Sequence, residues 1–366
     1  MGERGYTIFA PEEKDPDKDS EVFFNTEMRL NRDLSEIASR VFRDRIDVES
    51  YRVADPLSGS GIRGFRYSEH ADEVHLNDSN PEAVESIKKG LEENGIEAEV
   101  HEKDANVFLS ENWNRFHLVD IDPFGPFTNF LDSAVRAANH RSLVGLTATD
   151  NSAPTGSYRT VCRRRYGAEP LKNSFMHETA LRIYIREAFR NFARFDKCFE
   201  PKVCWHERHY SRVIGRVTES KKRTNRNLGN IGELSFCPEC RWRKLERAAA
   251  CGNCGNTDLA YAGPLWTGKL SDQRFTGDML EEIPDEWQKS REFLQKIDSE
   301  AEILTPFYDV HELASTVEVS VPPRDELIGS LRDRGYPVSR THFSPTGFRT
   351  DAPVSDVREM VEETSP

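Results

Sequence analysis

The sequence predicts an α/β protein with a doubly wound parallel sheet, followed by a second, smaller α+β domain that holds four cysteines. Strand-like and helix-like segments alternate between residues 51 and 149, and this alternation is typical of parallel βαβ units with right-handed crossovers. The 366 residues amount to about two and a half typical domains. The cysteine pairs lie beyond the alternating region and predict a separate module.

The N-terminal residues 1–20 are polar and rich in Pro and Asp, so we expect an arm. Apolar residues at helical spacing predict an amphipathic helix within 21–42. Five strands are expected at 51–57, 73–77, 97–102, 117–121 and 142–149, with helices between them at 61–70, 81–94, 105–111 and 126–138.

A longer helix over 173–194 precedes two strands, 202–210 and 212–219, that would complete the sheet. The polar stretch 221–232 predicts a boundary, which divides the chain into 1–228 and 229–366. Beyond it we expect the cysteine module, an acidic helical region at 277–302 and a mixed tail at 321–366. Ligands of doubly wound sheets bind beyond the carboxyl ends of the strands, so site residues are expected there.

Composition excludes several classes of protein. No apolar run approaches the ~18 residues of a membrane span, and the N-terminus has no apolar signal core. Seven cysteines, an odd number, argue for reduced thiols and a cytoplasmic location. The net charge is −13, and 36 of the 50 basic residues are Arg, a composition that we interpret as adaptation to high salt.

Basic residues are concentrated in one part of the chain. Residues 155–255 carry 22 Lys/Arg against 10 Asp/Glu, which leaves 28 basic and 53 acidic residues elsewhere. Clustered cations, rather than overall charge, determine affinity for nucleic acids. This basic island, residues 155–255, predicts a polyanion site, although solvated helix faces would explain the charge equally well.

The turn after the first strand carries glycines at positions 59, 61 and 64. This spacing permits a tight turn and a close approach of the backbone to a nucleotide cofactor. Asp78 follows the second strand and is placed to accept hydrogen bonds from ribose, while Asp104 follows the third and is placed to contact adenine. NAD, FAD and S-adenosylmethionine all fit the turn, and the two acids favour S-adenosylmethionine.

The fourth strand leads into Asp122-Pro123-Phe124-Gly125. A carboxylate that accepts hydrogen bonds from an exocyclic amine assists methyl transfer to its nitrogen. An adjacent aromatic ring stacks on an extruded base. The element resembles the Asp/Asn-Pro-Pro-aromatic signature of amino-methyltransferases without the second proline, and Asp120 is a second candidate carboxylate. Asp-Pro is also a common way to open a turn.

Two Cys-x-x-Cys pairs, Cys237/Cys240 and Cys251/Cys254, are separated by ten residues. Four thiolates at this spacing predict a closed, structural zinc site. The other three cysteines are interpreted as core thiols. His177-Glu178 lacks the second histidine of a helical metal motif and is interpreted as structural.

Taken together, the motifs resemble the tRNA (guanine-26) dimethyltransferases, which methylate the 2-amino group of guanine with S-adenosylmethionine. The stretches that carry the resemblance are Phe23-Phe24-Asn25, 30–34, 55–64, Asn77-Asp78, 122–125, Thr149-Asp150, 162–167, 177–183 and 263–266. The resemblance implies a Rossmann-like S-adenosylmethionine-dependent methyltransferase domain joined to a zinc-containing domain that contacts tRNA. We expect a monomer.

The resemblance also implies roles for individual residues. Asp122 is expected to be catalytic, and Phe124 is expected to sandwich the guanine with either Phe23 or Phe24. The residues implied to bind the cofactor are Arg32, Asp55, Gly59, Gly61, Arg63, Asp78, Asp104 and Ala105.

Alternative functions are a methyltransferase acting on another amine, such as adenine in RNA or DNA, and a non-catalytic zinc protein that binds RNA. A nicotinamide oxidoreductase ranks lower because Asp122-Pro123-Phe124 would have no role in it. The sequence leaves monomethylation and dimethylation open.

Overall fold

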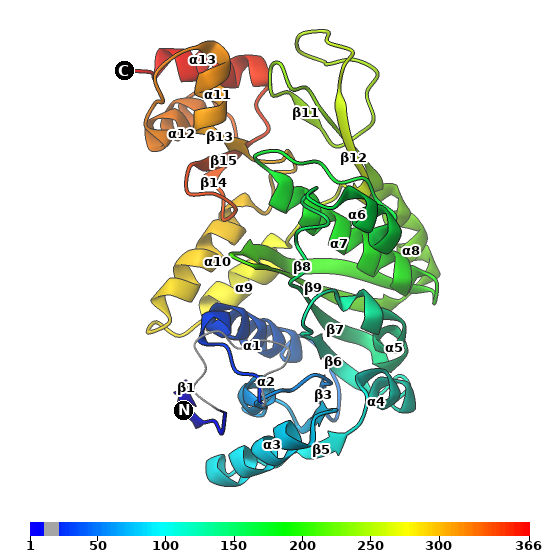
Figure 1. Cartoon of the computed structure of the whole chain (residues 1–366). Coiled ribbons are helices and arrows are strands. Elements are labelled where there is room, and N and C mark those ends of the chain that lie inside the picture. Colours follow the sequence, from blue (N-terminus) through cyan, green and yellow to red (C-terminus); the bar gives the residue numbers. More distant parts are fainter. Residues whose placement is uncertain (11–21) are drawn as a thin grey trace.

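The computed structural model describes residues 1–10 and 22–366, so residues 11–21 of the expected arm lie outside the described part. A seven-stranded sheet with the order β5-β4-β3-β6-β7-β9-β8 forms the centre of the molecule (Figure 1). The strands are β3 (Arg52–Asp55), β4 (Glu73–Asp78), β5 (Glu99–Glu102), β6 (Phe116–Ile121), β7 (Ala138–Ala148), β8 (Lys197–Glu207) and β9 (Tyr210–Glu219).

The first five strands of the sheet pair in parallel, as the alternating pattern predicts. β8 and β9 pair with each other and β9 pairs with β7 in antiparallel register, so the sheet is mixed. The connection between β8 and β9 is too short for a parallel crossover, which needs a dozen or more residues. The two last strands therefore complete the sheet as a hairpin.

The helices that connect the parallel strands are α2 (Ile62–Tyr67), α3 (Pro81–Asn94), α4 (Ala105–Glu111) and α5 (Leu131–Ala137). The 3-10 turn η2 (Phe127–Phe130) precedes α5, and the 3-10 turn η1 (Thr26–Met28) precedes α1 (Arg29–Arg43). Among the helices that were not predicted is α6 (Arg159–Tyr166). Only Cys162 and Tyr166 of its residues are buried, so the sequence shows little of the apolar periodicity that reveals a helix.

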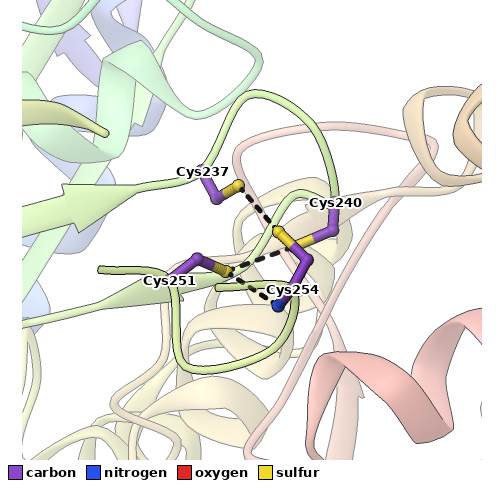
Figure 2. A group of neighbouring side chains, drawn as sticks. All are labelled: Cys237, Cys240, Cys251 and Cys254. Carbon is purple, nitrogen blue, oxygen red and sulfur yellow. Dashed lines mark hydrogen bonds between the residues drawn. The ribbon is translucent and has the colours of Figure 1, made fainter. Parts of the chain in front are cut away.

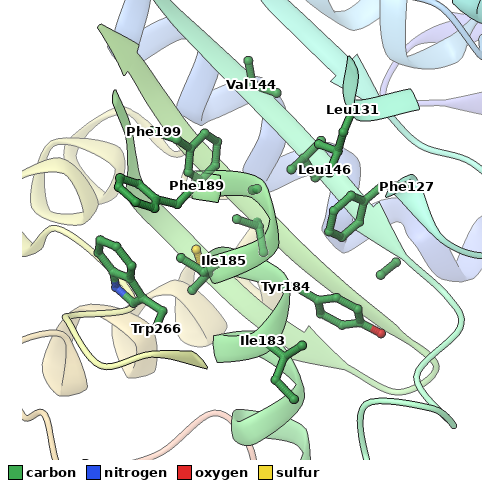
Figure 3. Close-up of a cluster of buried hydrophobic side chains, with 14 of the residues drawn as sticks. Phe127, Leu131, Val144, Leu146, Ile183, Tyr184, Ile185, Phe189, Phe199 and Trp266 are labelled. Carbon is green, nitrogen blue, oxygen red and sulfur yellow. The ribbon is translucent and has the colours of Figure 1, made fainter. Parts of the chain in front are cut away.

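Two apolar cores cover the two faces of the sheet. In Figure 3, side chains of α7 (Met176–Ala193), among them Tyr184, Ile185 and Phe189, lie over the strands together with Trp266. On the other face α1 packs with α9 (Gln273–Glu282) and α10 (Gln288–Glu300). Each large apolar side chain buried in this way contributes roughly 1.5–3 kcal/mol.

The C-terminal part contains two small antiparallel sheets, between which α9 and α10 follow in the sequence (Figure 1). The first consists of β10 (Ile231–Phe236), β11 (Arg243–Lys244) and β12 (Ala260–Trp266), after α8 (Lys221–Asn227) and η3 (Leu228–Asn230). The second consists of β13 (Tyr308–Asp309), β14 (Val338–Arg340) and β15 (Gly347–Thr350), with α11 (Val310–Val317), α12 (Arg324–Asp333) and α13 (Val354–Glu363). At the N-terminus, β1 (Gly2–Glu3) pairs with β2 (Tyr6–Thr7).

Residues beyond position 228 contribute to both cores of the main sheet. Leu234 and Trp266 belong to the core under α7, and Phe275 and Met279 belong to the core under α1. The division into 1–228 and 229–366 remains a prediction. These contacts show that the sheet and the C-terminal part share apolar interior.

A buried ionic network also joins α7 to the C-terminal part. The Glu178 carboxylate accepts hydrogen bonds from Arg349 at 2.9 and 3.0 Å and from Arg182 at 3.0 Å. Arg349 also donates to Glu300 at 2.9 Å. Removing one partner of such a buried network is strongly destabilising. Glu178 thus has the structural role that the sequence predicted for His177-Glu178.

Among the helices of residues 1–10 and 22–366, none is long and apolar enough to cross a membrane.

Candidate active site

The glycine turn between β3 and α2 has the conformation that its sequence requires. Gly61 caps α2 with φ +80°, in the left-handed region, which glycine adopts at little cost. Gly64 lies so close to β4 that an added Cβ would stand 2.0 Å from Leu76 Cδ2. The turn and the close packing of helix on strand agree with the roles predicted for these glycines.

The two acidic residues at the ends of β4 and β5 help to fix their loops. The backbone N–H of Gly59 donates to Asp78 Oδ2 at 2.8 Å, which ties the turn to the end of β4. Asp104 caps α4 by accepting hydrogen bonds from the backbone N–H groups of Asn106 and Val107. Ala105 is the first residue of α4 and is buried. These residues line up along one edge of the sheet, and their contacts with a cofactor remain a prediction.

Asp55, the last residue of β3, is buried. Within the described residues, neither oxygen of its carboxyl group has a well-formed hydrogen bond. Burial raises the pKa of Asp55 to about 8, because the Arg63 guanidinium offsets only part of the desolvation. A buried carboxyl group without a partner at the end of a strand is suited to meet a cationic ligand group.

Asp122 follows β6 and is paired with a buried arginine. Arg63 Nη2 of α2 donates to Asp122 Oδ2, and Arg63 Nη1 donates to Asn31 Oδ1 at 3.1 Å and to Asp120 Oδ2 at 3.3 Å. Burial alone would lower the pKa of Arg63, but Asp120 and Asp122 raise it well above its usual value. Arg63 was predicted to contact the cofactor. In the structure it pairs with the proposed catalytic carboxylate, and its contact with the cofactor remains a prediction.

Asp120 is fully buried beneath this ion pair. Arg212 Nη2 of β9 donates to Asp120 Oδ2 at 2.7 Å, Arg212 Nη1 forms an ion pair with Oδ1 at 2.7 Å, and the Tyr67 hydroxyl group donates to Oδ2. Burial raises the pKa of Asp120, but Arg212 and then Arg63 outweigh it and lower the pKa to about 2. Asp120 is fully buried and is absent from the pocket lining, whereas Asp122 lines the pocket.

A pocket of about 160 Å³ opens beside Asp122. It is smaller than the ~300–1,000 Å³ of ordinary small-molecule sites and suits a single ring system. Its lining residues are Phe23, Asn25, Met28, Asp122, Pro123, Phe124, Thr149 and His209. The sequence did not single out Met28, Thr149 or His209 as site residues, because they come from segments far apart in the chain.

The two adjacent phenylalanines before α1 have different environments. Phe23 lines the pocket with its ring centroid 4.4 Å from that of Phe124 and an interplanar angle of 78°. Phe24 is only 6% exposed and lies in the apolar cluster beneath α2 and α3. The structure therefore favours Phe23 as the ring that can face a base.

The segment that carries Phe23 is attached on both sides. The backbone N–H of Ser60 donates to the Phe23 carbonyl oxygen at 3.2 Å, which joins the segment to the glycine turn. Arg32 of α1 donates to the Asn25 carbonyl oxygen at 2.9 Å and to both oxygens of Glu3 at 2.6 and 2.7 Å. Arg32 is thus engaged with the N-terminal residues, and its predicted contact with the cofactor remains a prediction.

The sequence matches the profile of the N2,N2-dimethylguanosine tRNA methyltransferase family over residues 7–362. It is 37% identical over 378 residues to the tRNA (guanine(26)-N(2))-dimethyltransferase of Methanothermobacter thermautotrophicus, a match that covers 100% of this chain and 99% of that protein. The corresponding protein of Thermococcus kodakarensis is 35% identical, with 94% of each chain covered.

The chain belongs to the N2,N2-dimethylguanosine tRNA methyltransferase family. A solved structure of Trm1 from Pyrococcus horikoshii, described as a complex with S-adenosyl-L-methionine, superimposes with a TM-score of 0.85 at 29% identity and covers 97% of both chains. The resemblance inferred from the motifs, the α/β methyltransferase fold and the predicted enzyme, a tRNA (guanine(26)-N(2))-dimethyltransferase, are confirmed. The family name also answers the question of monomethylation or dimethylation in favour of dimethylation.

This member of the dimethyltransferase family gathers its two cysteine pairs into one cluster (Figure 2). The Cys237 and Cys254 sulfurs are 3.7 Å apart, and the Cys240 and Cys251 sulfurs are 3.4 Å apart. A tetrahedral zinc ion with Zn–S bonds of ~2.3 Å separates its sulfur ligands by about 3.8 Å. The four sulfurs therefore fit a closed zinc site.

The basic island of this dimethyltransferase is only partly available to RNA. Arg182 and Arg212, like Arg186 and Arg243, are buried and bonded to protein groups. Such arginines need partners from remote segments, which a local count of charges does not reveal. On α6 the side chains of Arg159 and Arg163 remain about 60% exposed while paired with Glu169.

Proposed function

We propose that the chain methylates the exocyclic amine of guanine 26 in the pocket formed by Asp122, Phe124 and Phe23. The observation that carries this assignment is the convergence of one carboxylate and two aromatic rings at the carboxyl end of β6. Ligands of doubly wound sheets bind at this edge. The carboxylate provides a proton acceptor for the amine, and the rings provide stacking surfaces for the base.

S-adenosylmethionine is proposed to bind across the carboxyl ends of β3, β4 and β5. The turn at Gly59 and Gly61 would accommodate its methionine portion, Asp78 its ribose and Asp104 its adenine. The unpartnered carboxyl group of Asp55 fits a site for a positively charged ligand. The Pyrococcus horikoshii complex with S-adenosyl-L-methionine supports this assignment, because its fold covers nearly the whole chain.

When bound, S-adenosylmethionine supplies a methyl group on a positively charged sulfur atom. Asp122 accepts a hydrogen bond from the guanine amine and orients the nitrogen lone pair toward that methyl group. As the new N–C bond forms and the S–C bond breaks, Asp122 takes the displaced N–H proton. Arg63 holds Asp122 Oδ2 and leaves Oδ1 free for the amine.

The same residues account for a second methyl transfer. A guanine amine has two N–H groups, and one remains after the first transfer. Asp122 would accept that N–H in the second round in the same way. Phe124, 49% exposed, and Phe23 would hold the ring plane of the monomethylated base as they held the unmodified one.

The tRNA body is proposed to run over the loop after β7 and over α6. Arg165 pairs with Asp150 at 2.5 Å, and the Tyr166 hydroxyl group donates to Asp150 at 2.7 Å. These contacts tie α6 to the loop that carries the pocket residue Thr149. A base inside a stem must leave the stack before it reaches such a pocket, and exposed arginines on α6 are suited to hold the flanking phosphates.

Zinc in the cysteine cluster is proposed to be structural, since four thiolates leave no position open for chemistry. Substitution of the exposed Cys254 by Ser should release one zinc per chain and lower the melting temperature without changing the affinity for S-adenosylmethionine. The chain is further proposed to act as a monomer.

The decisive experiment compares wild type, Asp122→Asn and the surface control Asp132→Asn, whose side chain is exposed and paired with Arg136 on α5. Each is incubated with unmodified tRNA transcript and labelled S-adenosylmethionine, and the nucleosides are analysed. We expect dimethylguanosine at position 26 from wild type and control, and a rate about 10²–10⁴-fold lower for Asp122→Asn. Methylated adenosine, or full activity of Asp122→Asn, would refute the assignment.

A further inference from the structure

A second group of metal-ligating side chains lies at the edge of the main sheet, away from the cysteine cluster. His75 of β4 is paired in parallel register with Glu99 of β5, and Asn77 is paired with His101. Because side chains alternate along a strand, His75, Glu99 and His101 project from the same face. Among the described residues they form a group whose three candidate ligand atoms lie within 4.8 Å of one another.

The distances between these atoms match those around a tetrahedral ion. His75 Nδ1 is 3.3 Å from Glu99 Oε2 and 3.4 Å from His101 Nε2, and His101 Nε2 is 3.7 Å from Glu99 Oε2. Ligands about 2.0–2.1 Å from a tetrahedral zinc ion are separated by about 3.3–3.4 Å. The three atoms therefore outline one face of a coordination tetrahedron, with the fourth vertex directed away from them.

The two imidazole rings are held in this arrangement by packing. The His75 ring contacts Phe116 with centroids 5.2 Å apart, and the His101 ring contacts Phe108 at 4.9 Å. His75 is fully buried. Rings fixed by their neighbours lose little freedom when they bind an ion, which favours affinity.

One acidic and one basic side chain, Glu73 and Arg115, lie beside the candidate ligands. Glu73 Oε2 lies 3.7 Å from His75 Nε2, beyond hydrogen-bond distance, and adds a negative charge beside the candidate site. Arg115 Nη2 lies 3.3 Å from the same Nε2 and 3.7 Å from Glu99 Oε1. The guanidinium opposes a cation at this place, so its removal should strengthen binding.

We propose that His75, Glu99 and His101 form a second metal site, which takes a zinc-like divalent transition-metal ion with water as the fourth ligand. Two imidazoles and one carboxylate are the ligand set that such ions accept with an open position. The ion would join β5, a four-residue strand at the edge of the sheet, to β4. This site is independent of the methyl-transfer proposal.

The experiment measures zinc stoichiometry on the full-length protein after equilibration with zinc and removal of loosely bound metal. Wild type is expected to retain two zinc ions per chain. Glu99→Gln and His101→Gln, substitutions at partly exposed side chains, should retain one. The control Glu102→Gln, an exposed carboxylate of the same strand, should retain two.

Cobalt substitution identifies which ion is lost, because only the cysteine site gives thiolate-to-cobalt absorption bands. Those bands should be unchanged in Glu99→Gln and His101→Gln, and circular dichroism should show an intact fold. Arg115→Gln should bind the second ion about tenfold more tightly than wild type. One ion per wild-type chain, two ions in the Glu99 and His101 variants, or an unchanged affinity in Arg115→Gln would overturn the proposal.

Discussion

The rings of Phe23 and Phe124 meet edge to face across the pocket, with centroids 4.4 Å apart. They come from opposite sides of the site, one from the segment before α1 and the other from the loop after β6. At this separation the rings contact each other. A base can enter between them only if one of the two segments moves.

Replacing either ring by alanine should weaken the reaction with tRNA. Stacking of a base on an aromatic ring is worth ~1–3 kcal/mol, so we expect kcat/KM for tRNA to fall roughly 5- to 150-fold in Phe23→Ala and in Phe124→Ala. Steady-state kinetics with a tRNA transcript measures the effect. Phe24→Leu is the control, because its buried ring should affect melting temperature more than kcat/KM; a larger kinetic loss there than in Phe23→Ala would contradict the assignment.

Binding of S-adenosylmethionine should release a proton from Asp55. The pKa of this carboxyl group is raised to about 8 in the free protein, so it is mostly protonated at about pH 7. A cationic ligand nearby lowers that pKa, and we expect the release of about one proton per ligand bound. Isothermal titration calorimetry in buffers of different ionisation enthalpy measures this number.

The matched variant for this test is Asp55→Asn, which should bind the ligand more weakly and release no proton. Because the pKa of Asp55 is raised in the folded state, its contribution to wild-type stability is lost as the pH rises from about 4 through about 8. Without ligand, the Asp55→Asn variant should therefore become more stable relative to wild type as the pH rises through this range. Equal proton release by both proteins would exclude Asp55 as the source.

Asp120 should stabilise the fold at neutral pH and lose this contribution at acid pH. Its pKa is lowered to about 2, so its contribution is present above the unfolded value of about 4 and is lost as the pH falls toward 2. At about pH 7 this difference in pKa corresponds to about 2–3 kcal/mol, and Asp120→Asn should lose at least that much stability because Arg212 also loses its partner.

Urea denaturation at several pH values measures the difference between wild type and Asp120→Asn, which should shrink below about pH 4. Asp132→Asn should stay within about ±0.5 kcal/mol of wild type. A difference that is constant with pH would show that the carboxylate charge of Asp120 does not contribute.

Charge reversal on α6 tests the proposed path of the RNA. Arg164 is exposed and, within the described residues, has no acidic partner. Arg164→Glu should weaken tRNA binding to a similar extent whatever base stands at position 26, and it should reduce the slope of log affinity against log salt by ~1. Lys289→Glu, at an exposed residue of α10, is the control. Equal effects of both substitutions would indicate only a change in overall charge.

The sequence indicated which local motif lines the pocket, but not how the remote segments around it are arranged. Asp122 and Phe124 could be identified because a strand end and an Asp-Pro-aromatic motif are local features. The choice between Phe23 and Phe24 depends on which of the two rings packs into the apolar cluster beneath α2 and α3. Two adjacent phenylalanines in a sequence do not show which one is buried. The pairing of Arg63 with Asp122 joins residues 59 positions apart, and no local feature of the sequence indicates it.

Elements with a clear local pattern were predicted, and elements without one were not. The periodic strands and helices of the sheet were predicted with errors of a few residues at their ends. The arginine-rich α6 was overlooked because its two buried residues are too few to form a pattern. The burial of Arg182 on α7 could not be predicted, because the carbonyl groups that accept its hydrogen bonds belong to the C-terminal part of the chain, at Trp266, Gly268 and Leu304.

The hydrogen bond from Ser60 to the Phe23 carbonyl oxygen links two binding events. One end of this bond belongs to the turn assigned to the methyl donor, and the other belongs to one of the two segments whose movement would admit the base. Occupation of the turn should therefore change the affinity for tRNA, and thermodynamics requires tRNA to change the affinity for the donor by the same factor. Fluorescence titrations of each ligand in the presence and absence of the other measure both factors, and a factor of one would show that the two sites are independent.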